Sequence, residues 1–190
     1  MKSHTAKLQL IWNVNKFRAR FNGVDIAIAP QQFPPFQVDA LVEEQDTAML
    51  LGESHSLPSG ENKPVWYFAN KLESKNLPTP GQVVVRDTQP LRLQAIVHDL
   101  DAEPSCSELW IFQAIQQIFD TAESRDLQAI QMPLLGTRYS QITSTQFFTI
   151  LLEIIVRKRP APIGKIWLVS TDFECEKLFR ELTRQVKQKI

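Results

Sequence analysis

Strand-like and helix-like segments alternate through the second half of the chain, and this order restricts the folds that it can adopt. Short apolar runs with the length of buried strands lie at residues 91–98, 127–132 and 165–170. Helical periodicity lies between and after them, at residues 107–124, from about residue 143 to residue 156, and after Asp172. Strands joined by helical crossovers pair in parallel. The order therefore predicts an α/β fold, with a largely parallel sheet and helices on both faces.

Two of these helices have recognisable starts and apolar faces. Ser107 is suited to cap the first, and Asp172 is suited to cap the last. In the first helix, the predicted inward face consists of Leu109, Phe112, Ile115, Ile118 and Phe119. In the last helix, it consists of Leu178, Phe179, Leu182 and Val186.

The first half of the chain is predicted to add further strands. Alternating apolar residues indicate strands at residues 7–14, 17–21 and 24–29, with Asn22-Gly23 as a turn. Short strands are also predicted at residues 38–42 and 82–85. Residues 43–64 have no periodicity and predict a long loop with one helical turn at residues 47–51, before a short helix at residues 65–72. No repeat or domain boundary is visible, so residues 1–190 are expected to form a single domain.

Composition argues against several classes of function. The 190 residues include 21 Lys plus Arg and 21 Asp plus Glu, so the formal net charge is zero. Proteins that bind nucleic-acid backbones in bulk carry an excess of basic charge, so this class is not expected. Cys106 and Cys175 form no CxxC pair, which favours reduced thiols in the cytoplasm over a metal site or disulfides. No apolar run is long enough to span a membrane, and no cofactor is indicated.

Residues 127–158 combine a strand, a glycine loop and the start of a helix. Pro133 ends the strand because it lacks the N–H that a sheet requires. The loop, residues 134–142, contains Gly136 and Thr137, and a Thr-Ser-Thr sequence at residues 143–145 can cap the helix that follows. Unpaired N–H groups and the positive end of the helix dipole would then face the loop, which suits a phosphate or another anion. The same pattern also occurs in a simple tight turn between a strand and a helix.

Several segments together resemble the macro domain, the ADP-ribose-binding family. Residues 38–42 (VDALV) are similar to its VDAIV strand, and residues 95–98 (AIVH) to its strand that ends in an isoleucine-histidine pair. Residues 129–137 (AIQMPLLGT) are similar to its strand, proline and GTG phosphate loop, and residues 167–170 (WLVS) to its last strand. The resemblance implies a three-layer α/β/α fold with a mixed sheet of six or seven strands.

The sequence departs from the family where the family holds its ligand. Residues 43–46 (EEQD) stand where the family has an NAAN segment, whose last asparagine contacts the distal ribose. The family's glycine-rich diphosphate segment is reduced to Gly52 and Gly60. In the phosphate loop, Arg138 and Gln141 replace the second and third glycines. Arg138 cannot let the backbone approach a pyrophosphate as a glycine does, although its guanidinium can itself bind a phosphate.

The resemblance implies a ligand on the glycine loop, with the long loop after residue 42 as a lid. The implied contacts on the glycine loop are Gly136, Thr137, Arg138, Tyr139 and Ser140. Asp25 is the nearest match to the family's adenine-contacting aspartate. Phe173, just after the last strand, is placed either to stack on a base or to fasten its helix to the core.

Other polar residues have two interpretations each. The acidic run at residues 43–46 either supplies a general base or metal site at the sheet edge, or is a solvated loop, and it would repel a diphosphate. His98, which precedes Asp99, suits either acid–base chemistry or a structural role. His55 has no partner nearby in sequence. Cys106 precedes a helix, which can lower a thiol pKa, but a small buried side chain is the simpler interpretation.

These features predict a divergent macro-like module that binds ADP-ribose or a related nucleotide diphosphate, without the family's hydrolase machinery. One alternative is a macro fold used for protein–protein interaction, which the acidic run and Arg138 favour over hydrolysis. Another is an ADP-ribosyl hydrolase, which would lack the family's asparagine and glycine segments here. The expected partner is thus a nucleotide diphosphate or a protein, and a membrane is not expected.

Overall fold

The structure, a computed structural model, describes residues 16–51, 77–158 and 161–189. The strands of the described part are β1 (Arg18–Phe21), β2 (Val24–Ala29), β3 (Ala40–Asp46), β4 (Val83–Arg86), β5 (Leu91–His98), β6 (Ala129–Pro133) and β7 (Lys165–Val169). Its helices are α3 (Glu108–Ser124), α4 (Ser144–Arg157) and α5 (Cys175–Gln188). The strand predicted at residues 7–14, the helix predicted at residues 65–72 and His55 lie outside the described residues.

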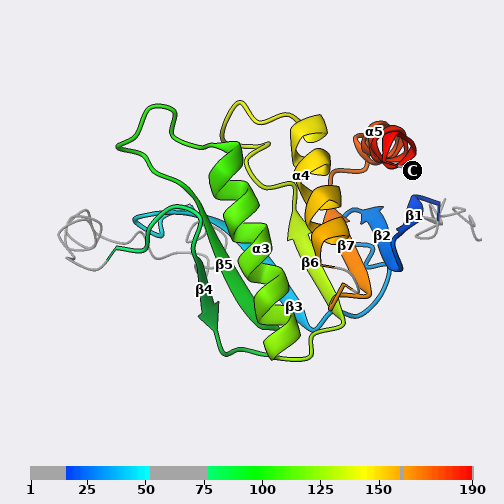
Figure 1. The fold of residues 1–190 in the computed structure, drawn as a ribbon, viewed down its shortest axis with the longest axis horizontal. Coiled ribbons are helices and arrows are strands. Elements are labelled where there is room, and N and C mark those ends of the chain that lie inside the picture. The colour runs from blue at the N-terminus through cyan, green and yellow to red at the C-terminus, as the bar shows by residue number, and fades with distance from the viewer. Residues whose placement is uncertain (1–15, 52–76, 159–160, 190) are drawn as a thin grey trace, which may run out of the picture.

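The strands form one mixed sheet in the order β1-β2-β7-β6-β3-β5-β4 (Figure 1). The two outer strands are antiparallel to their neighbours, and the five strands between them are parallel. The predicted α/β class with a mixed sheet is therefore confirmed, with seven strands. Because the inner strands are parallel, their ends meet at one edge of the sheet, which we call the carboxyl edge. It carries Asp46, His98, Pro133 and Val169, the last residues of β3, β5, β6 and β7.

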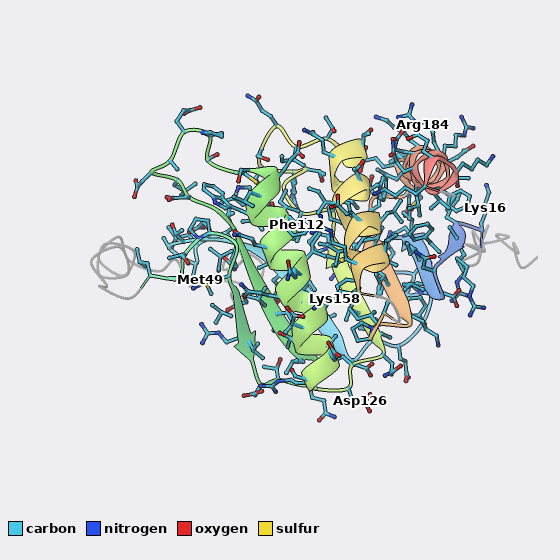
Figure 2. All side chains as sticks on the ribbon, in the orientation of Figure 1. Lys16, Met49, Phe112, Asp126, Lys158 and Arg184 are labelled. Carbon is cyan, nitrogen blue, oxygen red and sulfur yellow. The ribbon has the colours of Figure 1, made fainter. Side chains whose placement is uncertain are left out.

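The three described helices lie over one face of the sheet (Figure 1). Helix α3 contacts β4 and β5, α5 contacts β1 and β2, and α4 packs between these two helices. Lys158, the residue after α4 (labelled in Figure 2), forms an ion pair with Asp120 of α3 that joins the two helices at their surface. None of the described helices is long and apolar enough to cross a membrane.

Two predicted helix starts are confirmed and one is wrong. The Ser107 hydroxyl accepts a hydrogen bond from an N–H of the first turn of α3 at 3.3 Å, and Thr143 caps α4. Asp172 does not cap α5, because this helix begins after Glu174 and has no side-chain cap. The Asp172 carboxylate instead accepts a hydrogen bond from Gln32 at 3.3 Å.

The predicted apolar faces are confirmed except at Leu109. Leu182 and Val186 of α5 are buried, and so are most of the residues predicted for α3. Leu109, however, is 61% exposed. Its assignment to the inward face was wrong. An α-helix has about 3.6 residues per turn, so Leu109 lies nearly opposite Ile111, two residues later, which is fully buried.

Strand β3 is longer than predicted and includes the acidic run. It ends at Asp46 rather than at residue 42, so the interpretation of residues 43–46 as a solvated loop was wrong. Glu43 and Glu44 project to opposite faces because successive strand residues alternate. Each has a basic partner on β5: Glu43 pairs with Arg92 at 2.7 Å, and Glu44 pairs with His98. The helical turn predicted at residues 47–51 is a non-helical turn.

Candidate anion site at the carboxyl edge

The predicted glycine loop, residues 134–142, joins β6 to α4 at the carboxyl edge (Figure 1). Gly136 has a φ of +77°, which side-chain-bearing residues rarely adopt. A Cβ atom at this position would lie 2.6 Å from Cδ1 of Ile111 and 3.1 Å from Cγ1 of Ile142. Glycine is therefore required by the turn itself and by packing, since the protein's own side chains fill the space beside its Cα atom.

The N–H groups of Gly136 and Thr137 already have partners. The Gly136 N–H donates a hydrogen bond to Oε1 of Glu44 at 3.0 Å. The Thr137 N–H donates to the carbonyl of Leu134 at 3.1 Å, and the Ser140 hydroxyl donates to the Gly136 carbonyl at 2.6 Å. A carboxylate oxygen thus occupies the space in front of the Gly136 N–H, which we call the anion position.

The N-terminus of α4 is closed by its own side chains. The Thr143 hydroxyl accepts a hydrogen bond from the Gln146 N–H at 3.2 Å, and the Gln146 side-chain oxygen accepts one from the Thr143 N–H at 2.8 Å. This reciprocal capping box satisfies two N–H groups that the sequence left open. The candidate site is therefore the loop before the helix rather than the helix end.

Glu44 connects this loop to the sheet through His98. Nε2 of His98 lies 2.5 Å from Oε1 of Glu44, and the two side chains are 2% and 6% exposed. A carboxylate withdrawn from water requires polar partners, and Nε2 of His98 and the Gly136 N–H both contact the same oxygen. This geometry gives His98 a role in positioning Glu44, which favours the structural interpretation of His98 over acid–base chemistry.

Asp46 holds the chain that leaves β3. Its carboxylate accepts hydrogen bonds from three backbone N–H groups, those of Ala48 at 2.7 Å, Leu50 at 3.0 Å and Leu51 at 2.9 Å. Asp46 is fully buried, and the turn that it organises includes Met49 with a φ of +60°. The carboxylate therefore stabilises this turn, at the position where the macro-domain resemblance places a ribose-contacting asparagine.

Arg138 and Tyr139 lie on the outside of the loop. Both are exposed, and the Arg138 guanidinium lies 5.2 Å from the centre of the Tyr139 ring, within cation–π distance. The Tyr139 ring also meets the His98 ring edge-on, with 6.1 Å between centres. An exposed cation and an exposed aromatic ring thus adjoin the buried Glu44–His98 pair.

The structure does not bring Asp25 to this loop. Asp25 pairs with Lys165, the first residue of the parallel strand β7, so it lies at the opposite edge of the sheet. There its carboxylate is 3.8 Å from the Arg20 guanidinium. Phe173 follows β7, lies at the carboxyl edge and is 97% exposed. The interpretation of Phe173 as a fastener of α5 to the core is therefore wrong, and its ring is free for contact.

Cys106 lies just before α3 and is buried. Burial raises the pKa of the Cys106 thiol, and the charge of Glu44 raises it further, although a hydrogen bond with Ser140 acts in the opposite direction. A raised pKa disfavours the thiolate, which is the reactive form of cysteine. The structure therefore supports the interpretation of Cys106 as a small buried side chain.

The described part has a surface hollow that lies away from the glycine loop, and it has no metal site. A surface hollow of about 1110 Å³ lies near the opposite edge of the sheet, and its lining includes Phe36, Asp39, Pro90 and Trp167. Among the described residues, no group of three histidine, cysteine or acidic side chains is arranged to hold a metal ion. The glycine loop therefore stands apart from this hollow.

Sequence reasoning missed the partners of the acidic run. Glu44, His98 and Gly136 come from three strands or their ends, 54 and 92 residues apart from Glu44 in sequence. The available signal was the combination of a glutamate and a histidine near the ends of two predicted neighbouring strands. The separation of Asp25 from the loop was also missed, because its match to the family depended on spacing alone.

The structure is similar to solved macrodomain structures. A macrodomain of Oceanobacillus iheyensis with ADP matches it with a TM-score of 0.66 at 13% identity, over 91% of this chain and 97% of that one. The macro domain of ganglioside induced differentiation associated protein 2 gives 0.60 at 11% identity, over 85% and 83% of the two chains. A Trypanosoma brucei macrodomain in complex with ADP-ribose gives 0.56 at 12% identity, over 83% and 68%.

Sequence comparisons give no closer relationship. No protein-family model matches the chain, and no curated protein matches it. At identities this low, the structural matches show the fold of the chain and do not identify its ligand. The order of strands, the mixed sheet and the coverage of the matches nevertheless agree with the resemblance read from residues 38–42 and 129–137, and the chain has the macrodomain fold.

Proposed function

We propose that this chain is a divergent macro-like module that binds ADP-ribose or a related nucleotide diphosphate and lacks the hydrolase chemistry. The observation that carries the proposal is the bond between the Gly136 N–H and a carboxylate oxygen at 3.0 Å. A backbone N–H that holds one anionic oxygen at this distance is equally suited to a phosphate oxygen. Solved structures of the same fold include complexes with ADP and with ADP-ribose.

The exposed residues near the loop suit the remainder of such a ligand. In this proposal the Arg138 guanidinium pairs with a phosphate oxygen, since guanidinium groups bind phosphate through charge-assisted hydrogen bonds. Tyr139 and Phe173 offer exposed aromatic rings at the same edge of the sheet, where a base or a ribose can stack. Thr137 and Ser140 bond to backbone carbonyls of the loop, and so we assign them the role of shaping it.

The hydrogen bonds of the Asp46 carboxylate support the proposal that the module lacks hydrolase chemistry. A hydrolase has to orient a water molecule against the bond that breaks, with a side chain that is free to contact it. The Asp46 carboxylate already accepts three backbone hydrogen bonds and is fully buried. We therefore expect binding without release of ADP-ribose from a modified protein.

Calorimetric titration with ADP-ribose, ADP, NAD and inorganic phosphate tests the proposal. We expect saturable binding of ADP-ribose or ADP, and about tenfold weaker binding in Arg138→Ala, because one charge-assisted contact is lost. Arg125→Ala is the matched control, since Arg125 pairs with Asp87 near the opposite edge of the sheet. Absence of binding at millimolar ligand would contradict the proposal. Equal affinities of the two variants would remove Arg138 from the site.

Protein–protein contact is the second candidate function, favoured by the exposure of large apolar side chains. The carboxylates of Glu44 and Asp46 satisfy N–H groups from within the protein. At the same time, Leu100, Leu109 and Phe173 are 61%, 61% and 97% exposed. A protein that has filled its ligand position and exposes apolar side chains is suited to docking. Light scattering over a range of protein concentrations would reveal self-association, and a constant monomer mass would count against a homotypic contact.

A further inference from the structure

We infer that Glu44 is a built-in competitor for the anion position, whose carboxylate must leave the Gly136 N–H before a phosphate can bind there. This inference rests on the proposed function and adds a form of regulation to it. The free protein is then a closed form, in which the place of the ligand's phosphate is taken by an anionic side chain of the same chain.

The first argument is the identity of the contact. The Gly136 N–H can direct one hydrogen bond toward the space in front of it, and Oε1 of Glu44 accepts that bond at 3.0 Å. A phosphate oxygen bound to the same N–H would have to lie in the same place. Glu44 and the phosphate therefore exclude one another, both by volume and by the repulsion of two negative charges.

The second argument is that Glu44 is held in place by a partner. His98 lies 2.5 Å from the same carboxylate oxygen, and the pair is buried. Removing Glu44 from the Gly136 N–H therefore also disturbs the bond to His98, and a buried polar group that loses its partner is destabilised. The free energy of ligand binding in the native protein is therefore reduced by the stabilisation that Glu44 loses. A ligand must offset this cost with its own contacts.

The third argument comes from the neighbouring residue, which provides a control. Glu43 carries the same charge on the same strand but projects to the other face, where it pairs with Arg92 at 2.7 Å and is 29% exposed. Loss of Glu43 removes one negative charge from β3 without opening the anion position. A gain in affinity that depends on the occupied position must therefore appear at Glu44 and not at Glu43.

The experiment compares three variants by calorimetric titration with ADP-ribose and with inorganic pyrophosphate. Glu44→Ala empties the anion position, Glu44→Gln keeps an oxygen there without the charge, and Glu43→Ala is the charge control. We expect at least a tenfold gain in affinity in Glu44→Ala, a smaller gain in Glu44→Gln, and a change of less than about twofold in Glu43→Ala. Thermal unfolding of each variant checks that it is folded; if Glu44→Ala is not, Glu44→Thr replaces it, because threonine is shorter and suits a strand.

The possible results separate this inference from the proposed function. A gain specific to Glu44 supports both, and a shift of the Gly136 amide signal in the NMR spectrum of Glu44→Ala on addition of ADP-ribose places that gain at the loop. Equal binding by the native protein and Glu44→Ala overturns the competition and leaves the proposed function intact. Absence of binding by every variant overturns both. An equal gain in Glu43→Ala also overturns the competition, because it assigns the effect to overall charge.

Discussion

Gly136 of the glycine loop lies directly against Ile111 of α3, so closely that a methyl group on Gly136 would come within 2.6 Å of the Ile111 Cδ1 atom. Ile111 is fully buried, so a shift of its side chain would displace other atoms of the core. The conformation of the loop is therefore coupled to the packing of α3 against the sheet. Since the Gly136 N–H also holds Glu44, a disturbance of this packing would reach the anion position.

Substitution of Gly136 by alanine should destabilise the protein by roughly 2–4 kcal/mol, from the positive φ together with the clash. Gly23→Ala is the matched control. Gly23 also has a positive φ, +88°, but nothing lies within 4 Å of its added Cβ atom, so about 1 kcal/mol is expected. Urea unfolding followed by circular dichroism measures both. Equal losses in the two variants would show that packing against Ile111 contributes nothing.

Removal of the Asp46 carboxylate should destabilise the turn after β3. Asp46→Ala leaves the N–H groups of Ala48, Leu50 and Leu51 without their acceptor, for which we expect a loss of roughly 2–5 kcal/mol in the free energy of unfolding. Asp46→Asn keeps one acceptor oxygen and should lose less. Hydrogen exchange at these three amides gives the local readout, and unchanged exchange in Asp46→Ala would refute the assigned role.

Phe173→Ser should leave stability unchanged within about 0.5 kcal/mol, because the side chain makes little contact with the core. Phe119→Ala, a substitution of a fully buried phenylalanine in α3, should by contrast lose about 3–5 kcal/mol. If Phe173 stacks on the ligand, Phe173→Ser should also weaken ADP-ribose binding in the calorimetric titration. A large loss of stability in Phe173→Ser would restore the interpretation of this residue as a fastener of α5.

The two buried cysteines should make stability fall as the pH rises above the ordinary thiol pKa. Burial raises the pKa of both Cys106 and Cys175 in the folded protein. In that pH range the unfolded chain loses thiol protons while the folded chain keeps them, so unfolding releases protons and a higher pH favours it. Lysine and tyrosine also titrate there, so the comparison is with the double variant Cys106→Ala/Cys175→Ala. An equally steep decline in that variant would exclude the thiols as the cause.

The features that sequence predicted well depend on neighbours along the chain. The capping role of Ser107 follows from its place before an amphipathic helix, and its bond lies within the first turn of that helix. The end of a strand at Pro133 follows from the missing N–H of proline. The parallel sheet follows from the alternation of strands and helices, which is also a property of the order along the chain.

The features that sequence predicted poorly depend on partners far along the chain. Sequence alone predicts Glu44 to be a loop residue, because glutamate is uncommon in strands. Its partners, His98 and Gly136, become evident when β3, β5 and β6 are placed side by side. Asp172 has the chemistry of a helix cap, but Gln32, 140 residues away, takes its carboxylate. Rules based on neighbouring residues cannot predict that a distant residue will bind the side chain instead.

The alternation of Glu43 and Glu44 has a consequence for the alignment of β3 in the sheet. Glu43 meets Arg92 on one face and Glu44 meets His98 on the other. A slip of β3 by a single residue would exchange the two faces. Each carboxylate would then lie away from its partner, and one of them would lie beneath the helices without a polar partner. The two glutamates thus act as a check on strand alignment, and we expect insertion or deletion of one residue within β3 to be far less tolerated than a substitution there.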